Sequence, residues 1–340
     1  MPQRNRKLLL PMFAISAAFA ALVAAASDAH AQAPPPAASQ KLPREYTINV
    51  DVNLVVLHAT VLDPKGRQVN DLRKENFRVL EDGVQQTLSV FSHADIPVTM
   101  GIVIDDSGSM KDKRAAVNAA AVTFVKTSNP QDQVFVVNFN DIPYLDTPGD
   151  FASSMEELKA ALDKIDSRGG TALRDAVNLS LDHMKLGNRD KKVLLVITDG
   201  DDNASRYSLE EVVRYLQKGN TVVYTIGLLG SEEPGGLFKI HGGEAKRAAK
   251  VLEKLAEVSG GQAYFPKSVE EVESTCVGIA RDIRSQYTLA YTPTNAKKDG
   301  TFRTVRVEAQ HARGGRLTVR TRTGYFSPKI EAAAHATSGQ

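Results

Sequence analysis

The sequence predicts an α/β protein in which a doubly wound, mostly parallel sheet is flanked by, and inserted into, a small β-sandwich. Between residues 97 and 285, short apolar runs alternate with helical patterns, which is typical of a parallel sheet covered on both faces. Segments 44–96 and 286–328 instead show strand patterns. Together they hold about seven strands, a common number for a sandwich. Two small separate β units are the alternative.

The first 31 residues have the pattern of a secretory signal peptide. A basic start precedes an apolar run at 8–26, and Ala29-His30-Ala31 is a small-x-small cleavage site. The apolar run is long enough for an uncleaved signal anchor, which is the alternative. We therefore expect a protein that is secreted or lies in the periplasm or cell envelope, with no stable membrane span once the signal is removed.

Charge and cysteine content exclude some functions. The chain has 42 Lys and Arg against 40 Asp and Glu. Residues 1–31 carry three of the basic residues and one of the acidic ones, so the remainder has no net charge and no basic field that would attract nucleic acid. Cys276 is the only cysteine, and it lies in a helical pattern, where we expect a buried, inert thiol.

The elements follow in order along the chain. A Pro-rich linker is expected at 32–43, and Asp82-Gly83 is a hairpin signal between expected strands at 77–80 and 87–91. The tail at 329–340 is expected to be disordered. In the α/β part we expect strands at 98–105, 134–139, 192–198, 221–227 and 262–265, and helices at 112–127, 154–165, 172–185, 209–217, 244–258 and 269–284; the final β segment has expected strands at 288–291, 302–310 and 316–322.

The run Asp105-Asp106-Ser107-Gly108-Ser109 stands where the first buried strand of the α/β part ends and a helix begins. In open α/β sheets, ligands bind at the carboxyl ends of the strands. Asp105, Ser107 and Ser109 offer hard oxygen atoms, which suit Mg²⁺ or Mn²⁺, and Ca²⁺ after these, better than a soft metal. The run therefore predicts a divalent metal site.

Two further loops complete this prediction. Thr171 precedes an expected helix, and Asp199 follows an expected strand. With the first loop they supply two carboxylates and three hydroxyls for a metal that takes about six oxygens. The alternatives are that Ser109 and Thr171 only cap helices and that Asp199-Gly200 is only a turn. The acidic run that continues from Asp199 to residue 203 is expected to be a solvated loop.

In this order and frame, Asp105-x-Ser107-x-Ser109, Thr171 and Asp199 resemble the metal-ion-dependent adhesion site of the von Willebrand factor type A (VWA) domain, whose fold is Rossmann-like. The resemblance covers about residues 97–285. It implies that the hydroxyls ligate the metal, that the aspartates often act through water, and that an acidic side chain of a protein partner takes an open position. The segments 61–67, 76–83, 255–261 and 323–326 look like those of secreted bacterial VWA proteins, especially acidobacterial ones.

Ser109-Met110-Lys111-Asp112 resembles the integrin β segment that also feeds an adjacent Ca²⁺ site. That site expects a second acid where this chain has Lys113, so the departure speaks against an adjacent metal.

The sequence favours a binding module over an enzyme. A metal-assisted hydrolase would need a base beside the metal; the nearest candidates are Asp106 and Asp202, and no histidine lies beside the motifs. We therefore expect a non-enzymatic adhesion or assembly protein, with the hydrolase, or an envelope structural protein regulated by the metal, as the alternatives.

Overall fold

The computed structural model describes residues 54–230, 242–311 and 317–329, all of which belong to one compact unit that begins at residue 51. The expected signal peptide at 1–31 and linker at 32–43 lie outside these residues, as does the expected tail beyond Lys329. None of the helices in the described residues is long and apolar enough to cross a membrane.

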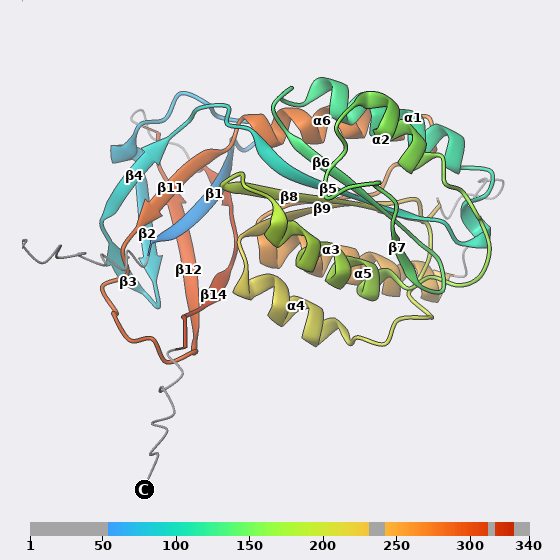
Figure 1. Ribbon diagram of the computed structural model, residues 1–340. Coiled ribbons are helices and arrows are strands. Elements are labelled where there is room, and N and C mark those ends of the chain that lie inside the picture. The colour runs from blue at the N-terminus through green and yellow to red at the C-terminus, as the bar shows by residue number, and fades with distance from the viewer. Residues whose placement is uncertain (1–53, 231–241, 312–316, 330–340) are drawn as a thin grey trace, which may run out of the picture. The chain divides into compact units, whose positions relative to one another are not determined.

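A six-stranded sheet forms the centre of the α/β part (Figure 1). Its core strands are parallel, and a short antiparallel strand closes one edge. All eight residues of the strand that leads to Asp105 are buried, which explains its continuous apolar run. In spatial order the strands are β10 (Ala263–Tyr264), β9 (Thr221–Gly227), β8 (Lys191–Thr198), β5 (Val98–Asp105), β6 (Gln133–Phe139) and β7 (Pro143–Leu145).

Helices cover both faces of this sheet (Figure 1). One apolar layer joins the sheet to α1 (Arg114–Thr127), α2 (Met155–Leu162) and α6 (Glu271–Arg284), and it contains the fully buried Cys276. Burial raises the pKa of this thiol to about 12, as expected for an inert cysteine. The opposite layer joins the sheet to α3 (Leu173–His183), α4 (Leu209–Lys218) and α5 (Gly242–Ser259).

Two four-stranded sheets flank the α/β part, and each combines strands from both ends of the chain. Their apolar faces share one core, which includes Leu57, Val79, Leu289 and Val307. This pairing agrees with the predicted fold class of an α/β part inserted into a small sandwich. One sheet has the order β13 (Thr318–Arg320), β1 (Val55–Leu62), β11 (Tyr287–Tyr291), β4 (Leu88–Ser92); the other has β14 (Gly324–Phe326), β12 (Phe302–Ala309), β2 (Phe77–Glu81), β3 (Val84–Gln86).

The hairpin differs in part from the prediction. Asp82 and Gly83 turn with positive φ angles of 46° and 81°, as a tight hairpin requires. The strand that pairs with β2 is β3, however, and the expected strand at 87–91 crosses to the other sheet as β4, where it pairs with β11. This crossing brings Leu88 into the shared core.

Candidate functional site

Asp105 ends β5 and is fully buried. Its Oδ1 accepts a 2.8 Å hydrogen bond from the backbone N–H of Ser107, and its Oδ2 accepts a 2.5 Å hydrogen bond from the hydroxyl of Thr198, at the end of β8. Burial, followed by the charge of Asp199, raises the pKa of Asp105 to about 6. Asp105 therefore ties the two strand ends together and adds negative charge beneath the site.

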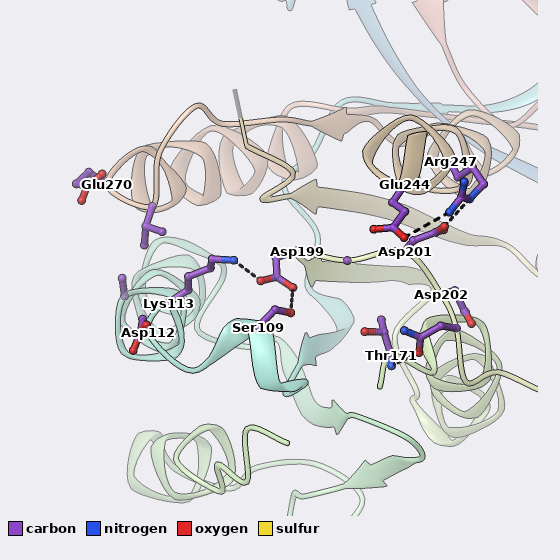
Figure 2. Close-up of a pocket in the computed structure, with 14 residues that line it drawn as sticks. Ser109, Asp112, Lys113, Thr171, Asp199, Asp201, Asp202, Glu244, Arg247 and Glu270 are labelled. Atoms are coloured by element: carbon purple, nitrogen blue, oxygen red, sulfur yellow. Dashed lines mark hydrogen bonds and ion pairs between the residues drawn. The ribbon is translucent and has the colours of Figure 1, made fainter. Parts of the chain in front are cut away.

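The two serines connect this strand end to Asp199. Ser107 Oγ lies 3.1 Å from Ser109 Oγ, and the Ser109 hydroxyl donates a 2.7 Å hydrogen bond to Asp199 Oδ1 (Figure 2). Asp199 follows β8 and is 1% exposed, while Ser109 lies in a short 3₁₀ helix at Gly108–Met110. Three of the five predicted residues thus form one hydrogen-bonded chain.

Thr171 belongs to a third loop at the same rim. Its backbone exchanges hydrogen bonds with Asn203: Thr171 N–H donates to Asn203 Oδ1 over 2.9 Å, and Asn203 N–H donates to Thr171 O over 3.1 Å. A Cβ placed on Gly200 would lie 3.4 Å from Thr171 Oγ1, so this hydroxyl lies beside the Asp199-Gly200 loop. Thr171, Ser109 and Asp199 line one pocket, and Asp105 and Ser107 lie buried next to them.

The capping interpretation of Ser109 and Thr171 was wrong. Helix α1 has Lys113 as its N-cap, and α3 has Ala172; neither helix has a side-chain cap. Ser109 lies in the 3₁₀ turn that precedes α1, and its hydroxyl donates to Asp199 instead of capping that helix. The polar side chains of these two residues are therefore free of the role that competed with metal binding.

The carboxylate of Asp106 is engaged by neighbouring groups of the fold. Its carboxylate accepts hydrogen bonds from Asp166 N–H (2.6 Å) and the Ser167 hydroxyl (3.1 Å), and it lies 3.6 Å from the guanidinium of the buried Arg114. Asp106 thereby fixes the loop that leads to Thr171. Nothing in the sequence pattern pointed to Arg114, whose guanidinium also donates to Asn138 Oδ1 and Leu162 O from more distant segments.

The acidic run after Asp199 is more ordered than the predicted solvated loop. Asp202 forms a bidentate pair with Arg174, with both contacts at 3.0 Å, and accepts a 2.7 Å hydrogen bond from the Ser205 hydroxyl. Burial would raise the pKa of Asp202, but the hydrogen bonds from Arg174 and Ser205 outweigh it and lower the pKa. Asp201 pairs with Arg247 of α5 over 2.7 Å (Figure 2). The run therefore braces the rim.

Lys113 forms an ion pair at the site that the sequence did not reveal. Its ammonium forms an ion pair with Asp199 Oδ2, on the opposite side of the carboxylate from Ser109 (Figure 2). The Lys113 side chain is 14% exposed and that of Asp199 is 0% exposed. The sequence had indicated only that Lys113 replaces an acid.

A pocket of about 940 Å³ opens beside these groups. Its charged lining is predominantly acidic. The acids are Asp112, Asp199, Asp201, Asp202, Glu244 and Glu270, and the bases are Lys113 and Arg247. Within the described residues, no three His, Cys, Asp or Glu side chains gather as a potential metal cluster, so hydroxyls would have to complete any ligand set here.

The sequence profile of the von Willebrand factor type A domain matches residues 100–275, which is more than half of the chain. The protein belongs to this family. The finer likeness to secreted acidobacterial proteins stays a prediction.

Among individual proteins, the chain is 24% identical over 144 residues to an uncharacterized protein of Borreliella burgdorferi, covering 42% of this chain and 39% of that protein. It is 35% identical over 82 residues to integrin alpha-11 of Mus musculus, covering 23% of this chain and 7% of the integrin. The chain thus spans less than half the length of these relatives. A solved von Willebrand factor type A structure from Catenulispora acidiphila is similar with a TM-score of 0.46 and 14% identity, covering 82% of this chain and 74% of that one.

Proposed function

We propose that this protein is an exported, divalent-metal-dependent binding module for adhesion or assembly. A Mg²⁺ or Mn²⁺ ion would be held by Ser107, Ser109 and Thr171 together with Asp105 and Asp199, and an Asp or Glu of a protein partner would complete its coordination. The observation that carries this proposal is the hydrogen-bonded chain from Ser107 through Ser109 to Asp199, beside Thr171 and an open pocket.

The residues present fit such a metal. All the predicted ligand atoms are hard oxygens, and the two carboxylates match the charge of a divalent ion. The Ser107 hydroxyl contacts the Ser109 hydroxyl, which in turn donates to Asp199, so the oxygens of these three side chains lie close together. Asp105 is held by a backbone N–H and by Thr198, which suits a carboxylate that orients the site from behind.

The chemistry of the bound metal would be that of an electrophile. Neutral hydroxyls add no charge to the ion, so an incoming carboxylate would be attracted strongly. The chain's own groups would orient this approach: Asp201 and Asp202, held by Arg247 and Arg174, keep the rim in place.

The hydrolase alternative has less support. Asp106 and Asp202, the candidate bases that the sequence offered, are both occupied as acceptors of several hydrogen bonds within the fold. A general base needs access to the proton that it removes. The geometry of these two carboxylates therefore favours binding over catalysis.

Export is proposed from the signal-peptide pattern in residues 1–31. Mass measurement of the protein recovered from its native host tests this point: cleavage after Ala31 is expected, and a full-length protein in the membrane fraction would indicate the uncleaved anchor.

Capture of partners from the native cell envelope tests the function. We expect the wild-type protein to retain a partner with Mg²⁺ and to lose it in EDTA, and Thr171→Val, which removes one hydroxyl, to retain none. Thr123→Val is the matched control because Thr123 lies on α1 and bonds to Glu273, and neither residue lines the pocket. Metal-independent capture that Thr171→Val leaves unchanged would contradict the proposal.

A further inference from the structure

We infer that Lys113 is an internal cation of the metal site, which pairs with Asp199 and lowers the affinity of the site for the metal. This inference rests on the proposed function, because it concerns how the same site is regulated.

The first observation is the position of the Lys113 ammonium. It contacts Oδ2 of Asp199, while Oδ1 of the same carboxylate accepts the Ser109 hydroxyl. Both oxygens of Asp199 are therefore engaged from opposite sides. A metal held by Ser107, Ser109 and Asp199 must share this carboxylate with the ammonium or displace it.

Burial strengthens the effect of this contact. The Asp199 side chain is fully buried, and only 14% of the Lys113 side chain is exposed. Charges in such a setting are screened far less than charges on the surface. A dication entering the site would meet the repulsion of a fixed ammonium, and displacing the ammonium would cost the ion pair. Either course weakens metal binding.

The charge of the completed site follows from this arrangement. Asp105 and Asp199 carry two negative charges when ionised, and a divalent metal alone would neutralise them. With Lys113 also present, the immediate group of Asp105, Asp199, Lys113 and the metal has one positive charge left over, within a pocket whose wider lining is acidic. A partner's carboxylate removes that excess, so Lys113 makes the site depend on the acidic partner as well as on the metal.

A direct test is calorimetric titration of Mn²⁺ and Mg²⁺ into the full chain and its Lys113→Met variant, which keeps the length of the side chain but removes its charge. We expect the variant to bind the metal about tenfold more tightly or better. Lys111→Met is the matched control, because Lys111 is an exposed lysine two residues away in the same segment, and it should leave the affinity unchanged. Lys113→Arg, which keeps the charge, should also bind as the wild type does.

A second readout is thermal stability, measured first without metal and then with it. Without metal, Lys113→Met leaves the buried Asp199 without this counter-charge, so its melting temperature should fall. Added Mn²⁺ should then raise that melting temperature more than it raises the wild-type value. If Lys113→Met does not fold, Lys113→Gln serves in its place, and Lys113→Arg supplies a folded comparison that keeps the charge.

The outcomes separate this inference from the proposed function. Wild-type protein that binds metal, with Lys113→Met equal to it or weaker, would overturn the inference alone. Metal binding that is detected only after Lys113→Met would support the inference in its strongest form. No metal binding by either protein would overturn the proposed function and the inference together.

Discussion

The hydroxyl of Thr60 in β1 donates a 2.9 Å hydrogen bond to the buried carboxylate of Asp282 near the end of α6, across 222 positions of sequence. The same carboxylate accepts hydrogen bonds from Gln68 (2.6 Å) and from the Tyr224 hydroxyl of β9 (2.7 Å), and it pairs with Arg320 of β13. One side chain thus joins the α/β part to strands from both ends of the chain.

Replacing this carboxylate should destabilise the whole unit. Asp282→Ala removes the acceptor of Arg320 and Tyr224 together, and breaking a buried ion pair costs about 3 to 5 kcal/mol. Asp182→Ala is the matched control, because Asp182 also accepts a lysine and a tyrosine hydroxyl but is 55% exposed, so we expect a loss below about 1 kcal/mol. Urea unfolding measures both values. Equal losses would contradict the role assigned to Asp282.

A pH-dependent stability is expected from His58 of β1. Burial, and then the charges of Lys191 and Arg322, lower its pKa from 6.5 to about 3. Between these two pH values the unfolded chain takes up a proton that the folded chain does not. His58 should therefore cost stability as the pH falls through this window and none above it, with a slope of up to about 1.4 kcal/mol per pH unit.

Denaturant unfolding at a series of pH values measures this slope. The difference in unfolding free energy between the wild type and His58→Gln should change between pH 6.5 and 3 and level off at higher pH. A difference that is constant from pH 3 to 7 would show that His58 does not resist protonation in the fold.

Two glycines should respond in opposite ways to alanine. A Cβ at Gly101, in the middle of β5, would lie 2.5 Å from Phe135 and 2.6 Å from Leu194 in the packed core, so Gly101→Ala should cost about 1 to 3 kcal/mol. Nothing lies within 4 Å of the corresponding position on Gly278, in α6, so Gly278→Ala should stabilise by about 0.5 to 1 kcal/mol. Thermal unfolding measures both variants. A Gly101→Ala variant as stable as the wild type would show that the core around Gly101 has room for the added methyl group.

Asn203 should influence metal binding although it supplies no expected ligand. Its side-chain Oδ1 accepts the Thr171 N–H over 2.9 Å, a bond that Asn203→Ala removes, and side chains that orient metal ligands affect affinity by about tenfold or more. Asn203→Ala should therefore weaken Mn²⁺ binding by about tenfold, as measured by calorimetry. Asn295→Ala, in a loop of the sandwich, should leave the affinity unchanged, and an unaltered affinity in Asn203→Ala would exclude this positioning role.

The sequence predicted the central strands well because complete burial leaves a continuous apolar run, as at Val98–Asp105 and Thr221–Gly227. It missed β7 and β14, each three residues long, because so short a strand shows no periodicity. The hairpin turn at Asp82 was recognisable from local chemistry, whereas the crossing of β4 to the other sheet depends on packing between distant segments.

The same division applies to the site. Strand ends and helix starts indicated that Asp105, Ser107, Ser109, Thr171 and Asp199 share one rim, and the structure places them there. The bonds that organise this rim come from residues without a local motif. Arg114 braces Asp106, and Lys113 contacts Asp199 across 86 positions, so only the folded chain reveals both contacts.

The central claim is that the rim holds one divalent metal. Calorimetric titration of Mg²⁺ or Mn²⁺ into the wild-type protein, with Thr171→Val and Asp105→Ala in parallel, tests it most directly. The account predicts that the wild type binds one ion per chain and that Lys113→Met binds it more tightly. Both ligand variants should lose binding and keep the fold. Absence of binding in wild type and Lys113→Met alike, or binding that Thr171→Val and Asp105→Ala leave unchanged, would contradict it.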